Sequence, residues 1–228
     1  MPTLREIMLL QELQHENVIE LIDVFPHKRN LYLVYEYMTS DLEAVIKDKA
    51  NLRLREADVK AYMRAILQGL AACHGHWIMH RDVKPNNILL GPSGQVKLAD
   101  FGAGRVFGSP NDKKFTTQVF ARWYRAPEVL LRATNYSSPI DVFAMGCIMA
   151  ELMTLRPLFP GSSEADQIYK ICSVLGSPTM RTWPEGIKLA AAMNFRFPQF
   201  VPTPLSQLIP NASPEAIQVR GLAFYLGI

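Results

Sequence analysis

Two short segments of this sequence hold polar residues of the kinds that one reaction would need together. Residues 80–87 read HRDVKPNN and offer a carboxylate, a lysine and an amide. Residues 100–102 read DFG and add a second carboxylate. Transfer of a phosphoryl group from ATP needs a carboxylate to accept a hydroxyl proton and a cation on the phosphate. It also needs an amide and a carboxylate that hold metal ions. The two segments therefore predict a phosphoryl-transfer site.

The chain between these segments indicates how they come together. Residues 88–90 (ILL) and 96–98 (VKL) are short apolar runs on either side of a turn sequence, GPSG, at 91–94. This pattern predicts a β-hairpin, which would set the two acidic segments side by side. A third motif, APE, follows at 126–128. The three motifs in this order are much more specific than any one of them alone.

The first half of the chain predicts a small sheet followed by helices. Apolar residues at helical spacing occupy residues 4–13, and two β-branched or aromatic runs follow at 18–25 and 31–37, with a polar turn at 27–30 between them. The pattern becomes helical from Asp41 onward. A clear apolar stripe in this part consists of Val59, Tyr62, Met63, Ile66, Leu67 and Leu70.

The second half predicts a buried helix at 139–155, entered through the turn-forming residues 137–139. After residue 175 the chain is rich in proline, which favours a loop-dominated segment before a last helix that starts near Ser213. A little sheet first and many helices afterwards indicate an α+β fold in which helices dominate.

Composition narrows the class of protein. Hydrophobic residues make up 49% and charged residues 20% of the 228 residues, as in ordinary globular proteins. The net charge is +3 and no Lys/Arg block occurs, so direct nucleic-acid binding is not expected. The most apolar window, residues 142–155, contains Glu151 and is too short to span a bilayer. Three scattered cysteines favour buried thiols in a reducing compartment, so we expect an intracellular protein of the cytoplasm and/or nucleus.

The three motifs resemble those of eukaryotic serine/threonine protein kinases of the cyclin-dependent-kinase type, over nearly the whole chain. This resemblance implies a protein-kinase-like fold with a partial N-lobe at residues 1–37, made of one helix and two strands. Residues 38–228 would form a mostly helical C-lobe that lacks its last helices. It also implies transfer of the γ-phosphate of ATP to Ser or Thr hydroxyls, with ATP and Mg²⁺ as cofactors.

The resemblance assigns a role to each residue of the expected catalytic centre. Asp82 would be the catalytic base, Lys84 the partner of the γ-phosphate, and Asn87 and Asp100 the Mg²⁺ ligands. Glu6 matches the helix glutamate that forms an ion pair with the ATP-anchoring lysine of the family.

The nucleotide site is predicted in the same way. Residues 35–38 (YEYM) match the hinge between the two lobes, where backbone groups of Glu36 and Met38 would hold adenine. Asp41 would lie near the ribose and Leu89 under the base, while Asp100 would bind the nucleotide through the metal.

Residues 119–128 (VFARWYRAPE) resemble the end of the activation segment in proline-directed kinases. The resemblance implies that Arg125 shapes the pocket for the proline that follows the target Ser or Thr. Protein substrates with Ser/Thr-Pro sites are therefore the expected partners.

Phosphorylation of the chain itself is also implied. Thr116 aligns with the activating threonine and Ser109 resembles a second phosphorylation site. A phosphate adds roughly two negative charges, which need basic partners. Arg5, Arg81 and Arg105 match the three arginines that collect this phosphate in the family.

Two branches of the family are represented. Residues 1–131 resemble the branch that activates cyclin-dependent kinases, as in FGSP at 107–110 and FAR at 120–122. Residues 132–218 resemble the MAK-like kinases, as in WPEG at 183–186 and MNFRFP at 193–198. The sequence LREI at 4–7 suggests a cyclin-type regulatory subunit, which MAK-like kinases do not need, so this partner stays open.

The chain also departs from the family. Five residues precede Glu6, where a full kinase carries the glycine-rich phosphate loop and the lysine, and residues 219–228 do not match the usual continuation. We therefore expect a chain truncated at both ends. Ala103 and Gly104 replace the usual Leu-Ala, and Gly104 is expected to loosen the segment. The alternative function is a catalytically dead fragment that acts as a binding module for cyclin-like partners or substrates.

Overall fold

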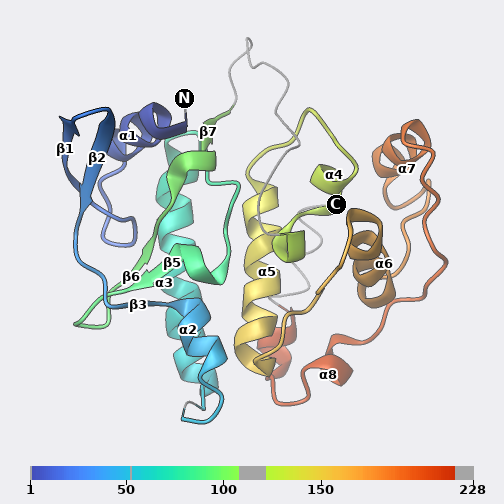
Figure 1. Ribbon diagram of the computed structural model, residues 1–228. Helices are drawn as coiled ribbons and strands as arrows, with labels where there is room; N and C mark the ends of the chain where they lie inside the picture. Colours follow the sequence, from blue (N-terminus) through green and yellow to red (C-terminus); the bar gives the residue numbers. More distant parts are fainter. Residues whose placement is uncertain (1, 52, 108–121, 219–228) are drawn as a thin grey trace. The chain divides into compact units, whose positions relative to one another are not determined.

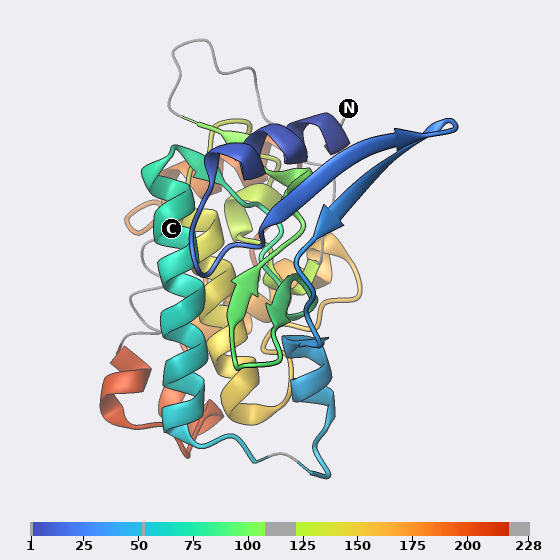
Figure 2. The ribbon, with the colours of Figure 1, turned by 90° about the vertical axis from the view of Figure 1, so that its left-hand side faces the viewer.

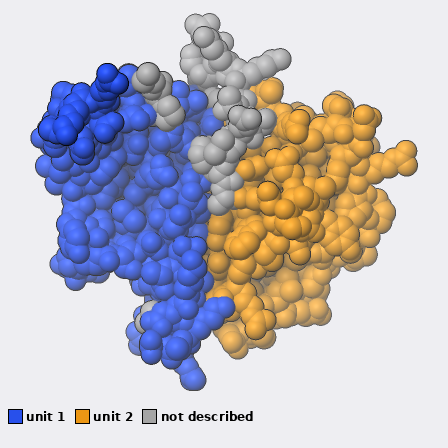
Figure 3. Space-filling model, in the orientation of Figure 1, with its two compact units in different colours: residues 1–110 blue, residues 111–228 orange. Residues whose placement is uncertain are grey.

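The computed structural model describes residues 2–51, 53–107 and 122–218 (Figure 1). The chain divides into two units, residues 1–110 and residues 111–228 (Figure 3). Helices predominate and the strands are few and short, which confirms the predicted α+β class. The boundary between the partial N-lobe and the C-lobe, expected after residue 37, stays a prediction.

The first unit begins with a helix and a β-hairpin, as predicted. Helix α1 spans Pro2–Glu12, and the antiparallel strands β1 (Leu21–His27) and β2 (Asn30–Tyr35) form the hairpin. The turn is tighter than expected because Lys28 adopts a left-handed conformation with φ 54°, so β1 continues to His27. Figure 2 shows this hairpin extending away from α3.

A three-stranded antiparallel sheet carries the chemistry-bearing segments. Strand β3 (Ser40–Asp41) pairs with β5 (Ile88–Leu90), which pairs with β6 (Val96–Leu98). The β5–β6 hairpin is the one predicted between the two acidic segments. Val18 forms an isolated bridge with Leu98, which ties the chain before β1 to this sheet.

Two helices follow β3. Helix α2 spans Leu42–Lys47, and the long helix α3 spans Glu56–Gly75 and contacts β6. The predicted stripe of α3 is buried at Val59, Met63, Ile66 and Leu70. Leu67 was expected in this stripe, but it is 39% exposed because it lies at the edge of the helix face that Val59, Met63, Ile66 and Leu70 form.

The second unit is built around the buried helix α5 (Pro139–Thr154). The short elements η3 (Arg122–Tyr124) and α4 (Pro127–Leu130) precede it, and α6 (Glu164–Leu175) follows. Helix α4 contacts α6 and α7 (Pro184–Ala192), and η3 contacts α5 and α6.

The expectation of a loop-dominated segment after residue 175 was partly wrong. Helix α7 forms there because Pro184 occupies its first turn, where a missing N–H costs nothing. Helix α8 (Leu205–Leu208) follows, and residues 214–218 are helical, in agreement with the predicted start near Ser213.

The three cysteines are buried free thiols. In the part of the chain that the structure describes, no helix is long and apolar enough to cross a bilayer.

Candidate active site

Asp82 is the centre of the site. Lys84 Nζ lies 2.6 Å from Asp82 Oδ2, and Asn87 Nδ2 donates both to Oδ2 at 3.0 Å and to the Asp82 carbonyl at 2.9 Å. The 3₁₀ turn η1 (Pro85–Asn87) brings the amide back to the carboxylate because it reverses the chain within three residues. The three predicted catalytic residues are therefore gathered at one carboxylate.

Burial sets the proton affinity of this carboxylate. The Asp82 side chain is almost fully enclosed, and burial raises its pKa above the usual value. The hydrogen bond and charge of Lys84 act in the opposite direction but with smaller effect. A base with a raised pKa accepts a hydroxyl proton more readily, because its proton affinity is closer to that needed at the working pH.

His80 holds Asp82 in place, a role that the sequence analysis did not assign. The imidazole is fully buried; its Nδ1 accepts the Asp82 N–H at 3.2 Å, and its Nε2 lies 3.0 Å from the Ala99 carbonyl. Since Nδ1 accepts, Nε2 must carry the proton and donate to Ala99. The signal for this role was the position of His80, two residues before Asp82 in the HRD motif.

Ala99, which directly follows β6, is fixed from a second side. The Ala99 N–H donates to the Asn87 carbonyl at 2.9 Å, so the catalytic segment is tied to the residue just before Asp100 twice. The His80 ring also meets the Phe101 ring edge to face, with centroids 4.7 Å apart. These contacts bring residues 80–87 and 100–102 together, as the hairpin predicted.

Two residues of these motifs have strained backbones. Arg81 has φ 71° and Asp100 has φ 63°, both in the left-handed region that non-glycine residues rarely adopt. Such conformations cost about 1–3 kcal/mol and cluster at functional sites, where the surrounding contacts hold them in place.

Glu6 and Asp100 face the same space. A Cβ atom built on Gly102 would lie 3.3 Å from Asp100 Oδ1 and 3.8 Å from Glu6 Oε2. Burial raises the pKa of Glu6, and the charge of Asp100 adds to this effect. The Tyr35 hydroxyl donates to Glu6 Oε1 at 2.8 Å, which opposes the shift, and burial together with Glu6 raises the pKa of Tyr35.

A pocket of about 570 Å³ lies beside these carboxylates. Five of the predicted site residues line it, namely Glu6, Glu36, Met38, Leu89 and Asp100. Four further lining residues had no predicted role, namely Ile19, Tyr35, Tyr37 and Ala99. Tyr35 and Tyr37 belong to the hinge motif and Ala99 directly precedes DFG, so these positions carried a usable signal.

The hinge is fixed by an ion pair and leaves backbone groups available. The Glu36 carboxylate pairs with Lys97 Nζ at 2.7 Å and accepts the Glu20 N–H at 2.8 Å. Among the described residues, neither the Glu36 carbonyl nor the Met38 N–H has a hydrogen-bond partner. These are groups that the edge of a purine base could pair with.

Asp41, predicted near the ribose, does not line this pocket. Its carboxylate caps α2 by accepting the Ala44 N–H at 2.8 Å. A role toward ribose stays a prediction.

The donor set fits Mg²⁺. Asn87 uses its Nδ2 toward Asp82, which leaves the amide oxygen for other partners, and Asp100 supplies a carboxylate. Within the described ranges, no group of three or more His, Cys, Asp or Glu side chains could hold a metal by itself. Mg²⁺ commonly takes only one or two carboxylates together with waters and substrate phosphates, so two protein ligands suffice.

The predicted phosphate-collecting arginines are partly placed. Strands β4 (Ile78–Met79) and β7 (Arg105–Val106) pair so that Arg105 lies opposite Met79, two residues before Arg81. Arg5 lies on α1. Thr116 and Ser109 lie outside the described residues, so the phosphorylation sites and the arginine cluster stay predictions.

In the second unit, Arg125 forms an ion pair with Glu164 at 3.1 Å. Neighbouring side chains fix the same segment: Trp123 Nε1 donates to the Gly161 carbonyl at 3.1 Å, and the Tyr124 hydroxyl donates to Glu151 at 2.6 Å. The proline pocket assigned to Arg125 stays a prediction.

The Oε2 atom of Glu128 in the APE motif is buried and has no hydrogen-bond partner in the described parts of the chain. Burial raises the pKa of Glu128 to about 7.

Gly104 does not serve as the loosening point that was expected. Its φ is −53°, an ordinary value for any residue. A Cβ atom here would lie 2.6 Å from Leu9 Cδ1 and 3.0 Å from the Phe101 carbonyl oxygen. Glycine is needed because α1 approaches the 3₁₀ turn η2 (Phe101–Ala103) closely, and the segment is tightly packed.

Comparison with known proteins agrees with this geometry. The sequence matches the protein kinase domain over residues 1–217. Cyclin-dependent kinase D-1 of Arabidopsis thaliana is 54% identical over 222 residues, which cover 97% of this chain and 54% of that protein. Serine/threonine-protein kinase MAK of Homo sapiens is 54% identical over 217 residues, which cover 95% of this chain and 34% of that protein.

A solved structure gives the same result. A chain in the structure of the CAK complex of Chaetomium thermophilum bound to ATP-γ-S matches with a TM-score of 0.90 and 38% identity. The match covers 99% of this chain and 71% of that chain. By length, this chain spans about half of the Arabidopsis thaliana cyclin-dependent kinase D-1 and about a third of human MAK.

Proposed function

This chain belongs to the protein kinase domain family, within the CDK-like and MAK-like serine/threonine kinases, and from that premise we propose a proline-directed phosphotransferase activity. The protein that contains it transfers the γ-phosphate of ATP to Ser or Thr hydroxyls that precede proline. The observation that carries this proposal is the cluster of Asp82, Lys84 and Asn87, which two hydrogen-bonded links tie to the residue before Asp100. Identity is 54% to a cyclin-dependent kinase and 54% to MAK, which confirms the double resemblance.

The residues divide the reaction among them. The substrate hydroxyl passes its proton to the Asp82 carboxylate while its oxygen bonds to the γ-phosphorus and the bond from that phosphorus to ADP breaks. Lys84 lies 2.6 Å from Asp82 and can contact both the base and the phosphate. Asn87 and Asp100 would hold Mg²⁺, which neutralises the phosphate charge when bound. The Glu36 carbonyl and Met38 N–H bind the adenine edge, and Leu89 packs against its face.

Substrate and partner choice are the finer part of the proposal. Arg125 and the segment before APE support a preference for proline after the target residue. The CAK complex gives one precedent for a kinase chain of this fold in a larger assembly. A cyclin-type subunit that contacts α1 would act on Glu6, since Glu6 lies on this helix and lines the nucleotide pocket. We place the reaction inside the cell, in the cytoplasm or nucleus, where ATP and reduced cysteines coexist.

The test uses the longest natural protein that contains this chain, assayed on a peptide with a Thr-Pro site and on the same peptide with Thr-Ala. We expect phosphate transfer to Thr-Pro, and Asp82→Asn to reduce kcat/KM at least 100-fold, as for other general bases. Glu43→Gln removes an exposed carboxylate on α2 and serves as the control. Absence of transfer to both peptides contradicts the kinase function, and equal transfer to both contradicts proline direction alone.

One observation favours the alternative of a binding module. In the described residues the carboxylate of Glu6 is held by Tyr35 instead of a lysine. A binding module would not need Mg·ATP, so calorimetry that detects Mg·ATP binding to this chain argues against it.

A further inference from the structure

Gln167 on helix α6 is a fully buried amide to which the proposed reaction gives no role. Its side chain is 0% exposed, although glutamine is mostly found at protein surfaces. Its Oε1 accepts the Gly161 N–H at 3.0 Å, and its Nε2 donates to the Trp123 carbonyl at 3.3 Å. The side chain therefore joins the loop before α6 to Trp123, which lies 44 positions earlier in the chain.

Few side chains could make both bonds. A backbone N–H can only donate and a backbone carbonyl can only accept, so residue 167 must offer an acceptor and a donor together. The neutral amide of glutamine does this, whereas a carboxylate has only acceptors and an ammonium group has only donors. The two bonds also offset the free energy that burying a polar group would otherwise cost.

Local structure aims this side chain at the loop. Ser163 caps α6 by accepting the Asp166 N–H at 3.1 Å, and Gln167 follows early in the helix. Helix side chains tilt toward the helix N-terminus, so Gln167 reaches back to Gly161. A Cβ atom on residue 161 would lie 2.4 Å from Gln167 Oε1 and 2.6 Å from its Cα. Glycine is therefore needed for this close approach.

Trp123 is fixed through both its ring and its backbone. Its Nε1 donates to the Gly161 carbonyl at 3.1 Å, while its own carbonyl accepts from Gln167. Arg122 Nη1 donates to the same Gly161 carbonyl at 3.3 Å and to the Ser162 carbonyl at 2.7 Å. These bonds hold the 3₁₀ turn η3 on the loop before α6.

Arg125, expected to shape the pocket for the substrate proline, directly follows this turn. Its N–H donates to the Arg122 carbonyl at 3.2 Å, and its guanidinium pairs with Glu164 at 3.1 Å. Glu164 is the first residue of α6, three positions before Gln167. The place of Arg125 therefore depends on how η3 and the start of α6 are held together, and Gln167 is the buried link between them.

We propose that Gln167 is a positioning residue for peptide substrates, which holds Trp123 so that Arg125 can select proline after the target Ser or Thr. This inference rests on the proposed proline-directed activity. The residues that line the nucleotide pocket all belong to the first unit, whereas the Gln167 network lies in the second. Loss of the amide should therefore change the use of the peptide and leave the use of ATP unchanged.

Gln167→Glu gives the sharpest test, because a protonated carboxyl group can replace the amide and a carboxylate cannot. The protonated group accepts from Gly161 and donates to Trp123, whereas the ionised group has no donor. Burial favours the neutral form, so the group ionises only as the pH rises well above its usual pKa.

The assay uses the longest natural protein that contains this chain, with the Thr-Pro and Thr-Ala peptides. Relative to wild type at the same pH, Gln167→Glu should raise the KM for the Thr-Pro peptide increasingly between about pH 6 and pH 9, to about fivefold or more. The preference for Thr-Pro over Thr-Ala should fall with it, and the KM for ATP should not change.

Two further variants separate positioning from folding. Gln167→Met removes both bonds at every pH, so it should raise the peptide KM, relative to wild type, by the same factor at both ends of the pH range. Trp123→Phe changes a side chain that is 41% exposed and removes only the indole bond. It should give a smaller rise in the same direction, even if Gln167→Met does not fold.

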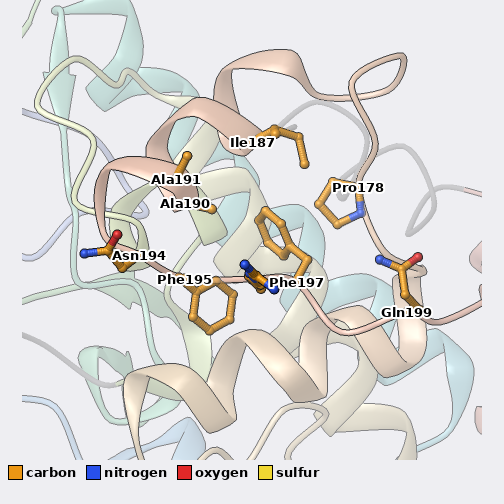
Figure 4. Close-up of a pocket in the computed structure, with 9 residues that line it drawn as sticks. Pro178, Ile187, Ala190, Ala191, Asn194, Phe195, Phe197 and Gln199 are labelled. Carbon is orange, nitrogen blue, oxygen red and sulfur yellow. The ribbon is translucent and has the colours of Figure 1, made fainter.

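The matched control is Gln199→Glu, which makes the same chemical change on an exposed side chain. Gln199 lines a groove of about 570 Å³ between α7 and the segment after it, far along the chain from the Gln167 network (Figure 4). This variant should match wild type at every pH. Thermal unfolding verifies the fold of each variant.

The ¹⁵N NMR signal of the Trp123 indole gives a readout that needs no activity. It should move with pH in Gln167→Glu and stay in place in Gln199→Glu. A signal that does not move, a peptide KM that Gln167→Glu leaves independent of pH, an equal rise in the KM for ATP, or an unchanged Thr-Pro preference would each overturn the proposal. A wild-type protein that phosphorylates neither peptide contradicts the kinase function instead.

Discussion

At the residue scale, Tyr35 and Glu6 share a hydrogen bond at the wall of the nucleotide pocket. Glu6 would pair with a lysine in the family pattern, yet here the phenol of Tyr35 lies 2.8 Å from one of its oxygens. The other oxygen points toward the space that Asp100 also faces. The tyrosine thus orients a carboxylate whose charge burial and Asp100 both disfavour.

We expect Tyr35→Phe to raise the pKa of Glu6 further, because the lost hydrogen bond stabilised the charged form. Loss of this bond should also lower the free energy of unfolding by about 1 kcal/mol. A ¹³C NMR titration of the Glu6 carboxyl and urea unfolding measure the two effects. Tyr32→Phe is the control, since this hydroxyl on the same strand bonds to no described residue. An unchanged Glu6 titration would show that the bond is unimportant.

Glu128 should make the stability of the chain depend on pH. Its pKa is about 7 in the folded protein and about 4.5 when unfolded, so between these values the folded state holds a proton that the unfolded state releases. Stability therefore falls as pH rises from about 4.5 to 7 and stays low above that. Glu128→Gln removes this cost and should stabilise the chain by roughly 2–3 kcal/mol at pH 8 and far less at pH 5.

Denaturant unfolding at both pH values measures the Glu128 effect. Glu185→Gln removes an exposed carboxylate of the same unit and controls for the change in net charge. Equal stabilisation by Glu128→Gln at pH 5 and pH 8 would mean that the carboxylate finds a partner when charged.

At the element scale, the end of β6 positions the chemistry. Residue 99 directly follows this strand and accepts from His80 while donating to Asn87, so one short strand sets the spacing between the base and the metal-binding carboxylate. Helix α1 contributes Glu6 to the same site. This helix can approach η2 closely because Gly104 has no side chain.

We expect Gly104→Ala to destabilise the chain by about 1–3 kcal/mol, because its Cβ would overlap Leu9 Cδ1. In a Leu9→Ala background the same substitution should cost much less, and a double-mutant cycle by urea unfolding measures this coupling. Gly75→Ala is the control, as a Cβ there meets no atom within 4 Å. If Gly104→Ala lowers the free energy of unfolding equally in both backgrounds, the overlap with Leu9 is not the cause of the destabilisation.

At the scale of the whole molecule, the balance of charge in the first unit decides which ligand can bind. Among the residues expected around the phosphates, three are carboxylates, Glu6, Asp82 and Asp100, and the lysine, Lys84, already pairs with Asp82. Lys97 is engaged by Glu36, which lines the pocket. The phosphates of ATP would therefore meet net negative charge.

We expect ATP to stabilise the chain only when Mg²⁺ is present. At a Mg·ATP concentration 100 times its Kd, the gain is about 2.7 kcal/mol, visible as a rise in Tm of several degrees. ATP with EDTA should give a much smaller rise, while adenosine, which lacks phosphates, should act equally with and without the metal. ATP that stabilises equally in EDTA would contradict the charge argument.

Much of the catalytic centre could be predicted from the sequence, because its geometry is local. Residues 85–87 form one 3₁₀ turn, and the hairpin from Ile88 to Leu98 needs only two apolar runs and a turn. Strand pairing and short turns depend on residues close in sequence, so the hairpin was expected to bring the two segments together. The roles of Asp82, Lys84, Asn87 and Asp100 came from the family motifs that these residues match. The hairpin of β1 and β2 and the helices α3 and α5 followed from the same periodicity.

Tertiary structure alone decided the contacts between distant residues. The pairs Tyr35–Glu6, Lys97–Glu36 and His80–Ala99 join segments whose approach depends on how helices and strands pack. Helix α7 was hidden by its proline-rich surroundings, and the groove after it arises from the turn at Asn194 together with Phe195 and Phe197. Sequence determines which groups are available and their local shape, whereas packing determines which of them meet, because side-chain burial and partner choice follow the fold as a whole.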